Sequence, residues 1–407
     1  MTLLDALKAV GSEDMSGRFP EHFLNEDFIP RPDDLELTEK AVGENARFCS
    51  LKEETVGKIL EAVRAASADP AVSLLAKTVF RCIFTEPGAY AGPWAWQPLD
   101  KAMGPLAGPL YLAIAAGWVP LLRAYHGAVN VPEEVTRDTC YQLRAYCDNY
   151  FTGTGKCGIY PQQLSWMHCY LDRERLFVRL GRFEYRWMRY GLDGHVYRSR
   201  KNGELVIFAI PGMQFDSAGF AVENTPDSPE RAFTSVYSED AEAGTVTGSR
   251  VDAFGRTSPE PYTIRKADYD LILGRGMPIL DMHIPNGGGM TPDEAERSFK
   301  RAKQFFNDLY KEERRPVAVV CASWIFNPNL PEFLNPESNL VRLLKRVHPV
   351  PRPSGKTDGL WFIFRHEGAF ELLKAPRKTS LQRAVTDFIA RGGRWRVGGM
   401  VLPMSEI

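Results

Sequence analysis

The chain has 407 residues, a length that fits about two to three domains. Fifty basic residues are balanced by 51 acidic ones, and the net charge of −1 excludes the basic excess that a nucleic-acid or anionic-membrane partner requires. The cysteines number seven, which is odd, and none forms a C-x-x-C pair. They predict reduced, mostly buried thiols in a cytoplasmic protein, and the N-terminus lacks the basic and apolar regions of a signal peptide.

Helices are expected through most of residues 1–170. The pattern Ser50-Leu51-Lys52-Glu53 is typical of a capping box, in which the serine and the glutamate each satisfy a backbone donor at a helix start. Pro132 suits the first turn of a second helix, and a short helix is expected over Pro161 to Tyr170. These signals predict a helical N-terminal domain over residues 1–170.

One segment, Met103 to Leu122, carries no charge and has the nominal length of a membrane span. Three prolines interrupt it, and its dense apolar centre is only about ten residues long, which is short for a bilayer. We therefore expect a core helix buried on all sides, and no membrane partner.

Strands replace helices after about Asp172. Aromatic and charged residues alternate within Leu176 to Tyr190, which predicts a strand, and Asn202-Gly203 is the favoured turn of a hairpin. Residues 210–260 are polar and are expected to form a long loop or a small inserted hairpin. From Asp268 the expected order is a strand to Ile284, a helix over 292–313, a strand over Val317 to Cys321, short helices over 329–347, a strand over Leu360 to Phe364, a helix over Ser380 to Arg391 and a final strand. Strands that alternate with helices predict an α/β sheet, at least partly parallel, in a second domain over residues 171–407.

The strand that ends at Ile284 carries two ionisable side chains, Asp281 and His283. Residues two apart on a strand face the same side, so a carboxylate can orient an imidazole or raise its pKa. The pair is a candidate for proton transfer, and the alternative is an ordinary structural hydrogen bond. A lone D-x-H lacks the third ligand of a catalytic zinc, which only the fold could bring from His348 or His366, so no metal is predicted.

A glycine triplet, Gly287 to Gly289, separates this strand from a helix that begins at Thr291 with Pro292 and Glu294. A helix N-terminus favours an anion, and glycines let a phosphate approach the backbone closely. The segment is thus a candidate cradle for a pyrophosphate. The alternative is a tight turn, because Asp293 and Glu294 would repel a phosphate.

The next strand ends in Ser323 and Trp324. Ligand sites in open α/β sheets lie beyond the carboxyl ends of the strands, so both residues are candidates by position. Cys321, inside the strand, is interpreted as a packed core thiol.

Four segments, in order between residue 152 and Leu402, carry a family resemblance: "TGKCGIYPQQLSWMHCYLDRERLFVRLGRFEY", "ILDMHIPNGGGMTPDEAERSFKRAKQFF", "VAVVCASWIFNPNLPEFLNPESNLVRLLKR" and "TSLQRAVTDFIARGGRWRVGGMVL". The chain resembles a bacterial acyltransferase-domain family with a helical N-acyltransferase-type N-terminal domain and a GNAT-like C-terminal domain. The resemblance implies an α/β (α+β) fold, in which a mixed-sheet GNAT-like domain follows the helical domain.

GNAT enzymes generally move an acyl group from acyl-coenzyme A to an amine, and the thioester lies where the fourth strand splays from the fifth. The resemblance makes Leu280 to Ile284 the fourth strand and Val317 to Ser323 the fifth. Acetyl-CoA or another acyl-CoA would be the co-substrate, and an amine of a small molecule or peptide the acceptor.

The resemblance also assigns roles to individual residues. His283, oriented by Asp281, would deprotonate the amine, and Ser323 would protonate the leaving thiolate. The residues implied to bind the coenzyme are Asn286, Gly287, Gly288, Gly289, Met290, Thr291 and Trp324.

The loop departs from the usual GNAT pattern Gln/Arg-x-x-Gly-x-Gly/Ala, because Asn286 stands where that pattern has its side-chain anchor. Two other functions therefore stay open. One is a non-catalytic ligand- or partner-binding protein that retains the GNAT-like fold. The other is a hydrolase that uses Cys321 or Ser323 with His283, for which no nucleophile-elbow motif is present.

Overall fold

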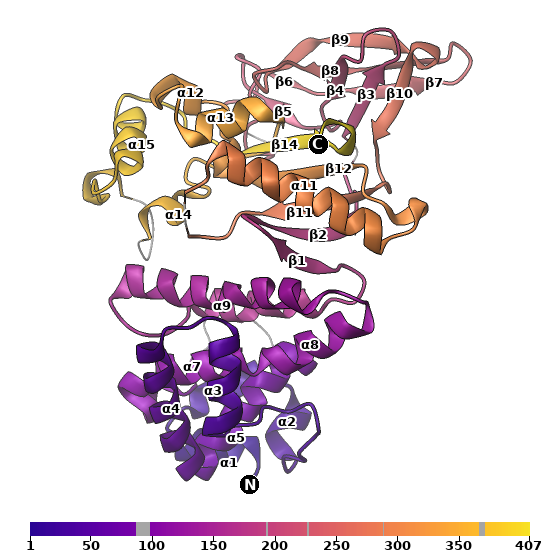
Figure 1. Ribbon diagram of the computed structural model, residues 1–407. Coiled ribbons are helices and arrows are strands. Elements are labelled where there is room, and N and C mark those ends of the chain that lie inside the picture. Colours follow the sequence, from indigo (N-terminus) through magenta and orange to yellow (C-terminus); the bar gives the residue numbers. More distant parts are fainter. Residues whose placement is uncertain (87–97, 193, 226–227, 288, 366–370) are drawn as a thin grey trace. The chain divides into compact units, whose positions relative to one another are not determined.

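The computed structural model describes residues 1–86, 98–192, 194–225, 228–287, 289–365 and 371–407. They form two compact units, one of Met1–Leu180 with Ile284–Gly288 and one of Gly181–His283 with Gly289–Ile407 (Figure 1). The units therefore change at Leu180, about ten residues beyond the boundary expected from the sequence, and the short segment after His283 belongs with the first of them.

The first unit is helical and ends in one strand, β1 (Phe177–Leu180). Its helices are α1 (Leu3–Ala9), α2 (Glu21–Asn25), α3 (Glu39–Phe48), α4 (Glu53–Ala68), α5 (Pro70–Phe80), α6 (Asp100–Met103), α7 (Ala107–Ala116), α8 (Trp118–Ala128), α9 (Glu133–Thr154) and α10 (Pro161–Trp166), with short 3₁₀ or π turns at Glu13–Arg18, Arg81–Thr85, Gly104–Leu106 and Met167–Leu171 (η5). The central helix α7 is apolar and almost wholly buried. Within the described residues, Asp100–Ala128 is long and apolar enough to cross a membrane, and 72% of its apolar window is buried inside the protein, as expected of a core helix.

The predicted capping box at Ser50 is wrong. Helix α4 begins at Glu53 with Lys52 at the cap, and no side chain caps it. Ser50 instead has a φ of 60° and closes the turn after α3, where its N–H donates to the carbonyl of Arg47. Its left-handed conformation removes it from the helix start.

The second unit contains a mixed sheet in the order β2 (Phe183–Arg189), β11 (Pro278–His283), β12 (Ala318–Ser323), β14 (Gly398–Pro403) and β13 (His348–Val350). Strands β11 and β12 are parallel, and their other neighbours are antiparallel. Helix α11 (Pro292–Leu309) packs on this sheet through Phe299, whose ring lies 5.4 Å from that of Phe183. The expected single strand from Leu176 to Tyr190 is broken at Gly181, which has a φ of 77°.

A second, antiparallel sheet follows the order β10 (Tyr269–Leu273), β3 (His195–Ser199), β4 (Leu205–Phe208), β8 (Thr245–Val251) and β7 (Tyr237–Asp240), with β9 (Thr257–Arg265) paired to β8. A small pair, β5 (Gln214–Phe215) and β6 (Phe233–Thr234), lies outside it. Residues 210–260 were expected to be a loop or hairpin, and they supply β7, β8 and the start of β9 to this sheet. The polar composition hid these strands, because only one face of the sheet packs against the mixed sheet. On that face Val251 packs in one cluster with Ile279, Val320 and Val401 of the mixed sheet.

The C-terminal part adds α12 (Leu330–Phe333), α13 (Asn339–Arg346), α14 (Leu360–Phe364) and α15 (Ser380–Ala390) (Figure 1). The strand expected over Leu360 to Phe364 is therefore wrong. The segment buries Leu360, Ile363 and Phe364, which is helical spacing, and left-handed residues bound it on both sides. The helical region followed by a mixed-sheet α/β domain confirms the predicted fold class.

Candidate functional site

Strands β11 and β12 pair over only three positions. The pairs are Ile279 with Ala318, Leu280 with Val319 and Asp281 with Val320. Beyond them β11 continues beside β2, as far as His283 opposite Glu184, whereas β12 continues beside β14, as far as Ser323 opposite Gly398. The two parallel strands therefore diverge at their carboxyl ends, between the Asp281–His283 segment and Ser323.

Asp281 and His283 make the contact that their spacing predicts. His283 Nε2 lies 3.1 Å from Asp281 Oδ2, and the same carboxylate oxygen accepts a hydrogen bond of 2.6 Å from Arg186. Burial acts to raise the pKa of Asp281, but the hydrogen bond to His283 and the charges of His283 and Arg186 outweigh it and hold that pKa below its ordinary value. An ionised carboxylate only accepts hydrogen bonds, so Nε2 carries a proton and the lone pair of the neutral ring is on Nδ1.

Arg186 was not foreseen from the sequence. It comes from β2, where it is the residue directly opposite Asp281, and Glu184, opposite His283, is buried at 2% exposure. The signal was present in the charged residues that alternate with aromatic ones along this strand. Using it required the register of β2 against β11, which no local pattern supplies.

Ser323 ends β12 and caps the 3₁₀ turn Trp324–Phe326, because its Oγ accepts a hydrogen bond of 3.3 Å from the N–H of Ile325. Its hydroxyl proton can still be donated. Trp324 packs against the cluster of α14 and α15, and a Cβ on Gly359 would lie 2.8 Å from it. Cys321 is buried, and burial raises its pKa well above the ordinary value, so it is a core thiol as expected.

The predicted loop residues differ in what they can offer a ligand. The amide of Asn286 donates to Asn149 of α9, and Gly287 has a φ of 113°, a conformation that favours glycine. Gly288 lies outside the described residues. A Cβ on Gly289 would meet no atom of the described residues within 4 Å, so the backbone there is open to approach, whereas the side chain of Met290 is buried at 8% exposure.

The helix start after the loop is a complete capping box. Thr291 Oγ1 accepts from the N–H of Glu294 at 3.3 Å, and Glu294 Oε2 accepts from the N–H of Thr291 at 3.1 Å. These hydrogen bonds hold the pKa of Glu294 below its usual range, and the charges of Arg297 and Arg182 add to the effect. Since Pro292 has no N–H, the first turn has already used most of the donors that a phosphate would need.

Among the described residues, no three His, Cys, Asp or Glu side chains come together as a group that could hold a metal ion. The sequence left His348 open as a third metal ligand beside Asp281 and His283. In the structure its Nε2 lies 2.7 Å from Glu406 Oε2 instead. His366, the other candidate ligand, lies outside the described residues.

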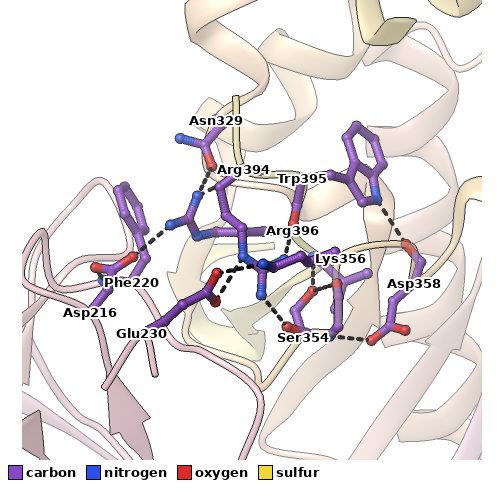
Figure 2. Close-up of polar contacts among 12 residues, drawn as sticks. Asp216, Phe220, Glu230, Asn329, Ser354, Lys356, Asp358, Arg394, Trp395 and Arg396 are labelled. Atoms are coloured by element: carbon purple, nitrogen blue, oxygen red, sulfur yellow. Dashed lines mark hydrogen bonds and ion pairs between the residues drawn. The ribbon is translucent and has the colours of Figure 1, made fainter. Parts of the chain in front are cut away.

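Two arginines just before β14 form a polar network (Figure 2). Arg396 donates to Asp216 at 2.6 Å and to Asn329 at 3.1 Å, and its guanidinium lies 4.8 Å from the ring centroid of Phe220. Arg394 donates to Glu230 at 3.1 Å. Since β14 begins opposite Ser323, the network holds the β5–β6 segment near the diverging end of β12.

Comparisons with known proteins agree with this architecture. Residues 177–402 match a GNAT-like C-terminal domain, and residues 44–172 match an N-acyltransferase N-terminal domain. No curated protein matches the chain. Two solved structures, an acyltransferase in complex with decanoyl-CoA and teicoplanin and an acyltransferase in complex with CoA and a teicoplanin derivative, each share 20% identity with a TM-score of 0.60, over 99% of this chain and 100% of theirs. An acyltransferase mutant in complex with octanoyl-CoA has a TM-score of 0.60 at 19% identity, over 99% of both chains. At such identities the likeness shows the fold.

Proposed function

Because this chain belongs to the family that has a GNAT-like C-terminal domain, we propose that it is an N-acyltransferase that moves an acyl group from an acyl-coenzyme A to an amine. The observation that carries the proposal is the divergence of β11 and β12 directly after Asp281, which opens the sheet where a thioester can lie. Structures of the same fold hold decanoyl-CoA, octanoyl-CoA and teicoplanin, which supports an acyl-CoA donor and a small-molecule or peptide acceptor.

His283 is the proposed general base. Its Nε2 is held by Asp281, so Nδ1 is the nitrogen that takes the proton of the attacking amine, directly or through a water. The imidazolium that forms lies next to an ionised carboxylate, which stabilises it. Arg186 limits this effect, because it shares the charge of Asp281, and the carboxylate therefore acts mainly by orienting the ring.

The proposed electrophile is the thioester carbonyl in the gap. Beyond Val320, β12 no longer pairs with β11, and backbone N–H groups on that side of β12 can polarise the carbonyl oxygen. Ser323, at the end of the same strand, is the proposed donor of a proton to the leaving thiolate. Its hydroxyl already accepts one hydrogen bond, which fixes its orientation.

The coenzyme's pyrophosphate is proposed to bind the loop backbone rather than the helix end. The open approach at Gly289 supports this, and the capping box of Thr291 and Glu294 leaves the helix few donors. Positive charge would come from Arg182 and Arg297, which act electrostatically on Glu294. These two arginines offset its carboxylate and replace the anchor that the usual GNAT loop carries.

The test begins with calorimetry of the purified protein with octanoyl-CoA and with CoA, followed by release of free thiol in the presence of a panel of amines that includes teicoplanin. Saturable binding together with thiol release that depends on an amine supports the proposal. A folded protein that binds neither compound favours the alternative, a binding protein that retains the fold. The seven cysteines, all free thiols, support a cytoplasmic location, which we also propose.

A further inference from the structure

The 3₁₀ turn η5 (Met167–Leu171) holds two reactive side chains in a fixed position. Met167 and Tyr170 are fully buried, and the ring of Tyr170 stacks on Phe177 at 4.3 Å. The two residues between them, His168 and Cys169, are exposed and half-buried, respectively. The anchored turn therefore presents an imidazole and a thiol on its outer side.

The contacts of His168 decide how the pair shares its proton. His168 Nδ1 lies 2.7 Å from the backbone carbonyl oxygen of Ser165, and a carbonyl only accepts, so Nδ1 carries a proton. Nε2 lies 3.8 Å from Cys169 Sγ. In the neutral pair the thiol donates to Nε2, and in the charged pair Nε2 donates to a thiolate. A nucleophile (Cys169), a base (His168) and a group that orients the base (the carbonyl of Ser165) are thus connected by successive contacts.

The surroundings of His168 favour the imidazolium, its charged form. The hydrogen bond to Cys169 raises the pKa of His168 to about 9 against the opposing effect of burial, and the carbonyl of Ser165 and the charge of Asp172 add to the rise. The other cysteines differ in access. Five are buried, and Cys157 is partly exposed next to Cys147.

We propose that Cys169 is a site of S-acylation, at which its sulfur takes the acyl group of a small thioester. The thiolate attacks the thioester carbonyl, a new carbon–sulfur bond forms at Sγ, and the bond to the departing thiol breaks. The proton that His168 removed from Cys169 passes to the departing thiolate, so no oxidant or other reactant is needed. Acyl-CoA as the donor rests on the proposed function, whereas the chemistry of the pair does not.

The experiment exposes the full-length protein to octanoyl-N-acetylcysteamine, a thioester without the nucleotide, and in parallel to octanoyl-CoA. Intact mass and peptide mapping follow the adduct, and hydroxylamine should remove it. We expect one octanoyl group on Cys169. The variant His168→Gln should slow its formation by about 10²-fold, the lower end for a positioned acid–base group. Cys157→Ser is the matched control and should leave the rate unchanged.

An adduct on Cys157 alone, no adduct on Cys169 with either thioester, or equal rates in the His168→Gln variant would each overturn the proposal, provided circular dichroism shows folded variants. Acylation by octanoyl-N-acetylcysteamine supports it even where calorimetry finds no coenzyme binding. That combination would contradict the proposed function and leave the S-acylation site standing.

Discussion

Arg186 donates a hydrogen bond of 2.6 Å to Asp281, the residue directly opposite it in the antiparallel pairing of β2 and β11. A guanidinium stays charged at every pH of interest, so the carboxylate beside it stays ionised. The same oxygen holds the histidine two residues along. In the proposed mechanism, His283 transfers the proton and Asp281, two residues before it on the same strand, orients the ring.

Replacement of the proposed base should remove turnover and leave binding intact. The variant His283→Gln keeps size and some hydrogen bonding but takes up no proton near neutral pH, so kcat should fall by about 10²–10⁴-fold. Asp281→Asn should cost less, because it alters orientation and keeps the ring. Octanoyl-CoA affinity, measured by calorimetry, should stay the same in both variants.

The reverse ranking, with Asp281→Asn the more damaging, would indicate that the carboxylate and not the imidazole carries the chemistry. Full activity in His283→Gln would mean that the amine reacts in its neutral form, positioned well enough to need no base.

The open backbone at Gly289 gives a test of the coenzyme loop. Gly289→Val should weaken octanoyl-CoA binding by about tenfold or more, because a branched side chain blocks approach to the backbone. The fold should tolerate the change, since a Cβ there meets no atom within 4 Å in the part of the chain that the structure describes. Unchanged affinity in a folded variant would place the pyrophosphate elsewhere. Gly287 is unsuited to this test, because its φ of 113° makes any substitution strained.

Elements with a complete local signal could be predicted from the sequence. The helix at Thr291 has its cap, its proline and its reciprocating Glu294 within four positions, and the structure confirms the capping box. The hairpin turn at Asn202-Gly203 joins β3 and β4 as expected. The contact between Asp281 and His283 follows from the period of two of a strand, which is also a local property.

The features that the sequence did not predict correctly depend on contacts with residues far away in the chain. Leu360 to Phe364 is a short apolar run, and periodicity alone does not separate a buried strand from a buried helix of that length. The β8 segment looked polar, because a sheet with one covered face needs few apolar residues. Arg186 became a site residue only through the register of β2. The roles assigned to Ser323 and to the glycine loop stay predictions.

The pair of Arg396 and Asp216 should stabilise the second unit. Their side chains are 10% and 19% exposed, and loss of one partner of a fully buried ion pair costs about 3–5 kcal/mol, which is an upper bound for this partly buried pair. Asp216→Asn is a mild change, because an amide oxygen can still accept the N–H groups of Ala218 and Phe220 that Asp216 Oδ1 accepts now. The denaturant midpoint of the full-length protein should fall.

The matched control is Asp270→Asn, which breaks the pair of Arg200 and Asp270. Those side chains are 58% and 57% exposed, and such surface pairs contribute about 0–1 kcal/mol. Equal shifts in the two variants would show that the polar network of Figure 2 does not hold the unit together.

The first unit should lose stability in mild acid because of His126. Its side chain is fully buried in α8, where Nδ1 lies 2.8 Å from Thr136 Oγ1, and burial lowers its pKa from 6.5 to about 4. In the unfolded chain, His126 is therefore protonated below pH 6.5, whereas in the folded unit it stays neutral down to about pH 4. The free energy of unfolding therefore keeps the whole contribution of neutral His126 above pH 6.5. It falls by up to about 3 kcal/mol as the pH drops from 6.5 to 4, which corresponds to the pKa shift.

The variant His126→Gln removes this titration, and its free energy of unfolding should change less between pH 6.5 and 4 than that of the unchanged protein. His22→Gln is the control, because it makes the same substitution at an exposed histidine of the same unit. His168 acts in another range, since its raised pKa adds stability that is present below pH 6.5 and lost as the pH rises toward about 9. Denaturant titrations at pH 4.5, 6.5 and 8.5 separate the two histidines. Parallel curves for His126→Gln and the unchanged protein in the acid range would show that the buried ring is protonated at its ordinary pKa.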